Sequence, residues 1–496
     1  MVDRQLRNAP IVVIGTGPGG AAAALALVEA GARVLVMEVG ADTFALGFTA
    51  RVRGITLAKR RPPLRRRTDL TLLGDPTTTV YEALAPGGLS NQWSCAVPRF
   101  SADDFDDAAR AGAAYTWPIG YSDLAPWYER IERRLHVAGS ERDVRHLPHG
   151  VLAHAWRLGD DWTAIGHAAE EIHRSVTVMP YANGAANLLT RGATAFNVYN
   201  QLLVPALQAK RLDILFHAHV RHLEWSSADK RVVAVVYRDT RTGDTKRILC
   251  SGVVVAAGAI NSARLLSQSR SADFPGGLGN QHGLVGKYLH DHPLAKLIVG
   301  VARPVSIYPA SYITRPALAH AAPLYAAALM QWCGTPALAK SVLRGLPGRS
   351  RSVGFSVFGT MIPTPETYAA FADDRLDAAG DAQTSVALRY APEVYRTLEQ
   401  ARDDLLGLLE RSGWQPSLTS WKIEPPGESV HYAGTCRMHA SEEFGVVNSS
   451  GRVYGVPNVA IGDSSVFTTG PEKNPVLTAM ALSARAADRL AADLRS

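Results

Sequence analysis

The stretch from Ile11 to Glu38 limits the possible folds of this chain more than any other segment. It contains an apolar segment, a glycine-rich turn, an alanine-rich segment and a second apolar segment that ends in an acid. We interpret these as a buried strand, a tight turn, a helix and a second strand. A strand, a helix and a strand in this order pair in a parallel sheet, with the helix on one face. The sequence therefore predicts an α/β fold.

The turn carries the pattern Gly-x-Gly-x-x-Gly, which is typical of dinucleotide binding in this context. Gly15 suits a positive φ, Gly17 lets the backbone approach a pyrophosphate, and Gly20 lets the helix pack closely on the strand. Glu38 lies 18 residues after Gly20, close to the spacing of about 20 expected for an acid that hydrogen-bonds an adenosine ribose. We predict that these residues and Pro18 contact a dinucleotide. The alternative is close packing of strand and helix with no ligand.

The size and composition of the chain limit its class. At 496 residues it exceeds what one hydrophobic core usually supports, so we expect two domains. Its 47% hydrophobic and 20% charged residues are typical of a soluble globular protein. We find neither an apolar signal segment nor an apolar run of about 18 residues, the length of a membrane span. We therefore expect a cytoplasmic protein that does not bind membranes.

The cysteines do not have the spacing of metal ligands. They are Cys95, Cys250, Cys333 and Cys436, scattered along the chain. This usage fits a reducing compartment and predicts no zinc site. His282, His290, Asp291 and His292 lie close together in one segment, and a metal site is one interpretation of them. We favour histidines that form structural hydrogen bonds, since adjacent loop residues rarely converge on one ion.

The net charge of +7 comes almost entirely from one basic run. Its members are Lys59, Arg60, Arg61, Arg65, Arg66 and Arg67. We interpret the run as a solvated loop, with a docking segment for an acidic partner as the alternative. Because it contains no interleaved aromatic residues, we expect no nucleic-acid binding.

Two further segments have the features of a cofactor site. Gly87 and Gly88, followed by Ser90 and Asn91, form a glycine-rich stretch whose backbone amides could face a ligand, although a surface turn is equally compatible. Residues 253–259 repeat the strand-to-glycine pattern, and Ala257 and Gly258 stand at the junction with a helix. A second junction in the same sheet suits FAD, because this long ligand crosses the edge of the sheet. A nicotinamide enzyme would usually have a second half-fold, which we do not find.

The C-terminal part contains the candidate chemistry. A strand ending at Gly462 and Asp463 places a carboxylate where strand termini meet ligands. Pro475 suits the first position of a long alanine-rich helix. The positive end of that helix is a suitable partner for the negative charge of a reduced flavin.

These motifs resemble those of the glucose-methanol-choline (GMC) oxidoreductases. The strongest are His431-x-x-Gly-Thr-Cys-x-Met, Gly462-Asp463-Ser-Ser and Asn474-Pro475. The resemblance implies FAD and oxidation of an alcohol carbon by hydride transfer to flavin N5. It implies that His431 and Asn474 form the catalytic pair, and it adds Val220 and Val476 to the cofactor contacts. Such a pair suits the chemistry, because a histidine can accept the hydroxyl proton and an amide can hydrogen-bond the developing alkoxide.

Within the family, the segment around Gln92 resembles the pyranose oxidase branch. The related aminoglycoside 6'-dehydrogenases and sugar or glycoside 3-oxidases are a better fit to a cytoplasmic chain of this length. That first branch commonly has a flavin-linked histidine where this chain has Gln92, which suggests noncovalent FAD. We expect a sugar, glycoside or aminoglycoside alcohol as substrate, with O2 or another electron acceptor, and a monomer or homo-oligomer. The alternatives are a sterol or other non-sugar alcohol, a flavin monooxygenase, and a catalytically silent flavin-binding partner.

The resemblance also suggests how the chain is divided. We assign residues 1–100, 210–295 and 425–496 to a discontinuous, Rossmann-like FAD-binding domain. Residues 101–209 and 296–424 form the substrate-binding domain and its connections. Between Lys296 and Lys422 the alternating pattern predicts an antiparallel sheet, with a helix from Pro392 to Arg411.

Overall fold

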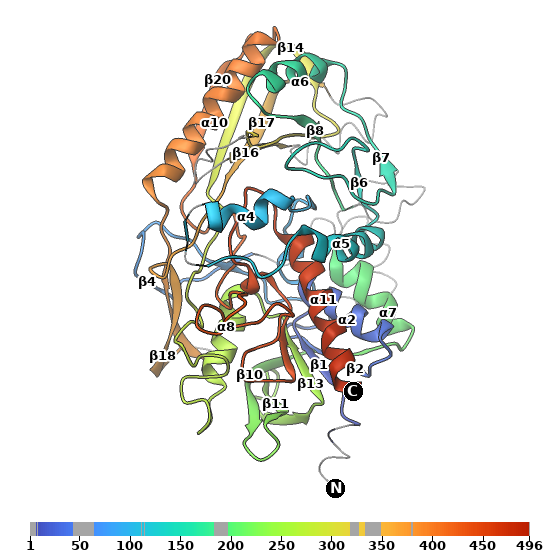
Figure 1. Ribbon diagram of the computed structural model, residues 1–496, viewed down its shortest axis with the longest axis vertical. Helices are drawn as coiled ribbons and strands as arrows, with labels where there is room; N and C mark the ends of the chain where they lie inside the picture. The colour runs from blue at the N-terminus through green and yellow to red at the C-terminus, as the bar shows by residue number, and fades with distance from the viewer. Residues whose placement is uncertain are drawn as a thin grey trace.

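The computed structural model describes residues 6, 8–42, 64–110, 112–113, 115–182, 197–317, 327–332, 349–377 and 380–495. Figure 1 shows an elongated molecule, with both termini at one end and a large antiparallel sheet towards the other. Helices and strands are mixed throughout, as the predicted fold class requires. The predicted α/β class with an added antiparallel sheet is confirmed.

A five-stranded parallel sheet forms the half of the molecule near the termini. Its order is β21 (Val459–Ile461), β13 (Gly252–Val255), β1 (Ile11–Ile14), β2 (Val34–Met37) and β9 (Asp213–Leu215). Strands β1, β13 and β21 are completely buried, which explains their continuous apolar sequences. Because all five strands are parallel, the segments that follow β1, β13 and β21 meet at one edge of the sheet.

Two helices that are far apart in sequence cover this sheet. Helix α2 (Pro18–Glu29) and helix α11 (Val476–Arg495) lie side by side in Figure 1. The hydroxyl of Ser483 donates to the carbonyl of Gly19 at 2.7 Å. Helix α11 begins at Val476, one residue later than predicted: Pro475 supplies the carbonyl that accepts from the Ala479 N–H at 2.9 Å. This role suits proline because it requires no N–H of its own.

A six-stranded antiparallel sheet forms the other half. Its order is β20 (Ser417–Ile423), β14 (Leu294–Ser306), β17 (Arg349–Gly359), β16 (Ala327–Trp332), β15 (Ser311–Ile313) and β8 (Val176–Val178). Helices α10 (Pro392–Arg411) and α6 (Asp161–Glu171) pack against it and share its hydrophobic core. The predicted sheet and α10 are confirmed. Helix α6 and strand β8 lie in a segment of mixed composition, for which the sequence predicts no particular helix or strand.

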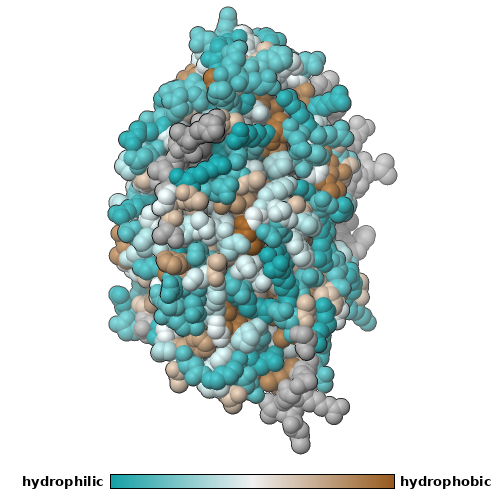
Figure 2. All heavy atoms as spheres, in the orientation of Figure 1, coloured by the Kyte–Doolittle hydropathy of each residue, from teal (hydrophilic) through white to brown (hydrophobic). Residues whose placement is uncertain are grey.

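The remaining elements lie outside the two large sheets. The helices are α4 (Ala102–Arg110), α5 (Tyr121–Leu135), α7 (Val204–Gln208) and α8 (Ala259–Gln268), with short turns η1 (Gly88–Asn91), η2 (Tyr199–Leu203) and η3 (Ser464–Val466). The strands are β3 (Arg65–Arg66), β4 (Thr71–Leu72), β5 (Tyr81–Glu82), β6 (Ala138–Gly139), β7 (His154–Ala155), β10 (Ala218–Ser226), β11 (Arg231–Asp239), β12 (Thr245–Leu249), β18 (Tyr368–Leu376) and β19 (Ala382–Ala387). On the face drawn in Figure 2, hydrophilic residues predominate and hydrophobic ones occur in small groups.

The basic run is only in part a solvated loop. Residues 59–61 lie outside the described residues, and Arg65 and Arg66 are exposed on β3. Arg67, in contrast, is 8% exposed and forms an ion pair with Asp69 at 2.8 Å. The prediction of a solvated loop is therefore wrong for Arg67. Its ion pair with Asp69 compensates the cost of removing the charged side chain from water.

Candidate active site

The glycines after β1 divide into two kinds. Gly15 has a φ of +106°, and a Cβ atom there would overlap the carbonyl oxygen of Ala256. A Cβ atom on Gly20 would likewise overlap the carbonyl oxygen of Gly15. Gly17 differs: its φ of −65° suits any residue, and a Cβ atom there would meet no atom of the described part of the chain within 4 Å. The fold does not require glycine at position 17, as expected where a ligand approaches the backbone.

Gly17 faces the predicted second glycine segment. A Cβ atom on Gly88 would lie 3.4 Å from the Cα atom of Gly17. Gly258, shortly after the end of β13, has a φ of +86°, and a Cβ atom there would also meet no atom of the described residues within 4 Å. Gly87 is tied to this region because its N–H donates to the hydroxyl of Thr16 at 3.0 Å. Glycines from three separate segments thus expose backbone without side chains in one region.

Glu38 lies at the carboxyl end of β2, as predicted, and is 5% exposed. Its carboxylate accepts hydrogen bonds from the Gly40 N–H at 2.8 Å and from the hydroxyl of Thr16. Burial raises the pKa of Glu38, an effect that these hydrogen bonds oppose. Its ribose contact stays a prediction, since both carboxylate oxygens are already hydrogen-bonded within the protein.

Asp463 joins the ends of β21 and β13. Its carboxylate accepts from the Gly258 N–H at 2.9 Å, from the Ser262 hydroxyl at 2.5 Å and from the Ser465 N–H at 2.9 Å. Burial raises its pKa, although these donors oppose the shift. Asp463 therefore holds the two strand ends together beside Gly258, whichever ligand binds there.

The remaining predicted cofactor residues lie in several elements. The hydroxyl of Ser90 donates to the Gly87 carbonyl at 2.6 Å, and the amide of Asn91 donates to the Gly88 carbonyl at 2.8 Å, so both side chains fix the glycine turn. Val220 lies at a bulge of β10. Ala257 follows β13, and Pro475 and Val476 lie at the start of α11, whose first turn contains no acidic residue.

The structure brings His431 and Asn474 together although they are 43 residues apart. The amide Nδ2 of Asn474 lies 3.4 Å from Nε2 of His431. Oδ1 of Asn474 is buried and has no hydrogen-bond partner among the described residues. Phe358 forms a wall beside them, with its ring centroid 5.5 Å from that of His431. The pair thus presents a ring nitrogen and an amide in close proximity.

Asp291 and His292 support His431, a role that the sequence did not reveal. Nδ1 of His292 lies 2.9 Å from Nδ1 of His431. The carboxylate of Asp291 accepts hydrogen bonds from the backbone N–H of His431 and from the Ser429 hydroxyl, both at 2.6 Å. His290 instead contacts the Tyr288 carbonyl at 3.0 Å. The prediction of structural histidines thus fits His290, whereas His292 touches a candidate catalytic residue.

Burial determines the ionisation of these groups. It lowers the pKa of His431 to about 4, so the imidazole is neutral at pH 7 and can accept a proton. Burial also lowers the pKa of His292 well below the usual value. It raises the pKa of Asp291 to about 7, against the opposing effect of its hydrogen bonds.

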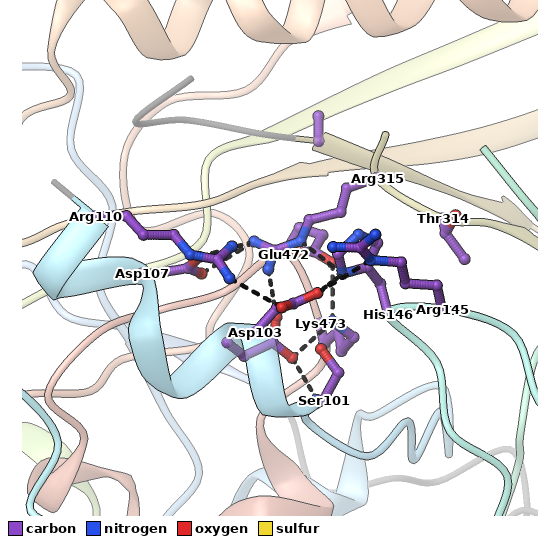
Figure 3. A network of polar contacts seen from close by, with 12 residues as sticks. Ser101, Asp103, Asp107, Arg110, Arg145, His146, Thr314, Arg315, Glu472 and Lys473 are labelled. Atoms are coloured by element: carbon purple, nitrogen blue, oxygen red, sulfur yellow. Dashed lines mark hydrogen bonds and ion pairs between the residues drawn. The ribbon is translucent and has the colours of Figure 1, made fainter. Parts of the chain in front are cut away.

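A buried network of charges holds the segment just before Asn474 (Figure 3). Nζ of Lys473 contacts Asp104 of α4 at 2.7 Å and Glu472 at 2.9 Å, and all three side chains are fully buried. Arg315 continues the network to Asp104 at 3.2 Å and to Asp107 at 3.0 Å. The sequence did not predict this network because its members come from separate segments of the chain. It fixes the backbone that presents Asn474.

The described residues offer no group of three or more His, Cys, Asp or Glu side chains that could hold a metal ion. Cys333 lies outside them, and Cys95, Cys250 and Cys436 are buried. None of the described helices is both long and apolar enough to cross a membrane.

Comparison with known proteins agrees with this geometry. Two family models, both described as GMC oxidoreductase, match residues 79–294 and 374–483. The chain is 28% identical to 2-methyl-1,2-propanediol dehydrogenase of Mycolicibacterium austroafricanum, over 96% of this chain and 94% of that protein. It is 29% identical to paromamine 6'-oxidase of Streptomyces fradiae, over 98% of this chain and 92% of that protein.

A solved structure has the same fold. Pyridoxine 4-oxidase from Mesorbium loti superposes with a TM-score of 0.64 at 18% identity, covering 97% of this chain and 99% of that one. The chain belongs to the GMC oxidoreductases and is an FAD-dependent enzyme that oxidises a CH–OH group. The open glycine surface around Gly17 and Gly258 fits this cofactor, and the alternative of a catalytically silent protein is set aside.

Proposed function

We propose that the enzyme oxidises an alcohol of a sugar, glycoside or aminoglycoside, with His431 as the general base. The observation that carries this proposal is the 3.4 Å approach of the Asn474 amide to Nε2 of a neutral His431. The relative paromamine 6'-oxidase supports the substrate class. The relative 2-methyl-1,2-propanediol dehydrogenase favours a second candidate, a small non-sugar diol.

The protein residues divide the work on the substrate hydroxyl. Nε2 of His431 accepts the hydroxyl proton, which makes the alcohol carbon a better hydride donor. The Asn474 amide N–H donates a hydrogen bond to the oxygen as its negative charge develops. When bound, FAD supplies the hydride acceptor. Phe358 narrows the space beside the His431 ring.

Gln92 stands where the related branch has a flavin-linked histidine, which suggests that FAD is bound noncovalently. Release of free flavin on denaturation tests this expectation.

The domain division proposed from the sequence is supported by the two sheets. The parallel sheet draws its strands from residues 11–37, 213–255 and 459–461, while strands of the large antiparallel sheet come from residues 176–178 and 294–423. The Phe358 wall belongs to the antiparallel sheet, and the Asn474 segment follows the parallel one. The active site therefore lies where the two meet.

The first test is the visible spectrum of the purified holoenzyme, recorded anaerobically with sugars, glycosides, aminoglycosides, small diols and sterols. We expect the oxidised-flavin band to bleach with a sugar-like alcohol. Admission of air then separates an oxidase from a dehydrogenase that needs another acceptor. Bleaching by small diols alone would replace the sugar assignment with the second candidate. Bleaching by NAD(P)H but by no alcohol would contradict the proposal.

The pH dependence of kcat/KM tests the ionisation of His431. A histidine base must be neutral, and its pKa of about 4 predicts a rate that stays level from pH 7 to about pH 5 and falls below that. A midpoint near 6.5, the value of an unperturbed histidine, that persists in Asp291→Asn would contradict this prediction. A step near pH 7 that Asp291→Asn removes would instead report Asp291.

Replacement of Gly17 by Ala tests the cofactor surface. Because the new methyl group meets no protein atom, we expect the free energy of unfolding of the FAD-free protein to change by less than about 0.5 kcal/mol. The dissociation constant of FAD should rise by about tenfold or more, measured by fluorescence titration. Gly20→Ala is the matched comparison: its methyl group overlaps the Gly15 carbonyl, so stability itself should fall by about 1–3 kcal/mol. Unchanged FAD affinity in Gly17→Ala would contradict the assignment.

A further inference from the structure

We propose that His292 is a positioning residue that holds His431 in the tautomer with an unprotonated Nε2. This inference rests on the proposed function of His431 as the base. A neutral imidazole carries one proton on one of its two ring nitrogens, and only the nitrogen without a proton can accept one. A base that faces the substrate through Nε2 must therefore carry its own proton on Nδ1.

The contact between the two histidines makes their tautomers depend on each other. Their Nδ1 atoms are 2.9 Å apart, so one of them donates and the other accepts. Burial lowers the pKa of both rings, so both are neutral at pH 7. If Nδ1 of His292 were the donor, Nε2 of His431 would carry a proton and His431 would not act as a base.

Asn474 decides between the two arrangements. Its amide Nδ2 lies 3.4 Å from Nε2 of His431. An amide NH2 group can only donate, so Nε2 of His431 must accept and carries no proton. The single proton of the neutral His431 ring therefore lies on Nδ1, which faces Nδ1 of His292. Nδ1 of His292 is then the acceptor.

The remaining contacts follow from this assignment. Nδ1 of His431 donates to His292, and Nε2 of His431 keeps its lone pair. The group facing that lone pair is Nδ2 of Asn474, a donor, at 3.4 Å. Oδ1 of Asn474 then points elsewhere, in agreement with its lack of a partner among the described residues. A single chain of hydrogen bonds thus runs from Asn474 through His431 to His292.

Backbone hydrogen bonds fix the segments that carry the residues of this hydrogen-bond chain. His290 and Ala433 exchange two backbone hydrogen bonds, at 3.0 and 2.9 Å, which align the segments that carry His292 and His431. Gly470 and Met361 likewise exchange two, at 2.7 and 3.0 Å, four residues before Asn474. The His292 side chain is buried, at 3% exposure. Both rings and the Asn474 segment are therefore held in place before any substrate arrives.

The test reads the tautomer of His431 directly. The FAD-loaded enzyme is prepared with 15N-labelled histidine, and long-range proton–nitrogen correlation spectra are recorded anaerobically without alcohol. The His431 signals are identified by their loss in His431→Ala. We expect Nδ1 of His431 to be protonated and Nε2 to be unprotonated. The opposite tautomer in the wild-type enzyme would overturn the proposal.

Two variants extend the test. His292→Leu removes the acceptor, so we expect His431 to lose its single tautomer and flavin reduction to slow by about 10- to 100-fold. His292→Asn keeps an acceptor oxygen near the position of Nδ1 and should restore much of both. A purely structural role would change stability without changing the tautomer. An unchanged tautomer and rate in His292→Leu would overturn the proposal.

The tautomer is read without substrate, so it distinguishes this inference from the proposed function. If His431 has the expected tautomer but no alcohol reduces the flavin, the proposed function fails while the inference about the hydrogen-bond chain stands. If alcohols reduce the flavin but His431 carries its proton on Nε2, only the inference fails.

Discussion

Replacement of His431 by Ala is expected to slow the reduction of bound FAD by substrate by about 100-fold or more, with FAD still bound. The variant loses the ring nitrogen that faces the Asn474 amide, at 3.4 Å, and with it the proposed acceptor for the hydroxyl proton. The proposed cofactor surface around Gly17 and Gly258 lies on other segments, so flavin content should not change. Anaerobic stopped-flow absorbance of the holoenzyme measures the rate.

His439→Ala provides the matched control. His439 lies eight residues further along the same segment, and its Nδ1 contacts backbone atoms of Ser441 rather than the proposed catalytic pair. We expect a change of less than about threefold, equivalent to less than about 0.7 kcal/mol in the barrier. Flavin reduction at the wild-type rate in His431→Ala would show that another group removes the proton.

Replacement of Lys473 by Met is expected to lower the free energy of unfolding of the holoenzyme by about 3–5 kcal/mol. Lys473 is fully buried between the carboxylates of Asp104 and Glu472, at 2.7 and 2.9 Å. Burial alone would raise the pKa of Glu472, but Lys473 and Arg315 lower it to about 2, so Glu472 is ionised. Removal of Lys473 leaves buried negative charge without its nearest cation, which is costly in a medium of low polarity.

Denaturation in urea measures the effect, and Arg142→Met is its control. Arg142 pairs with Glu170 at 3.2 Å, but both side chains are more than half exposed. We expect that variant to change the free energy of unfolding by less than about 1 kcal/mol. If Lys473→Met had an equally small effect, the buried network would not be needed to hold α4 against the Asn474 segment.

The core of the fold follows from local sequence patterns. The buried strands β1, β2 and β13 are continuous apolar runs. Gly15 follows β1 directly, and Gly258 follows β13 within a few residues. Such elements can be predicted from the sequence because the burial of a strand and the shape of a turn depend on residues that are close together in the chain. Helix α6 was missed because its segment mixes apolar, charged and aromatic residues without a clear period.

The candidate site was predicted only in part. His431 and Asn474 stand in segments with recognisable family motifs, so their residue types could be selected from the sequence. His292 could not be, because it contacts His431 across 139 residues and its neighbours Asp291 and His290 suggested only a structural cluster. The contact of Lys473 with Asp104 spans 369 residues and has no sequence signal.

Short-range patterns of apolar residues and glycines were enough to predict the strand–turn–helix units, and short motifs were enough to predict the residue types that suit flavin chemistry. The absence of described neighbours at the Gly17 Cβ position, the burial of Arg67 and the contact of His292 with His431 became apparent only in the folded protein. Each of these depends on how strands distant in the chain are placed side by side. The physical reason is that contacts between distant segments are fixed by the packing of whole sheets, which no local pattern records.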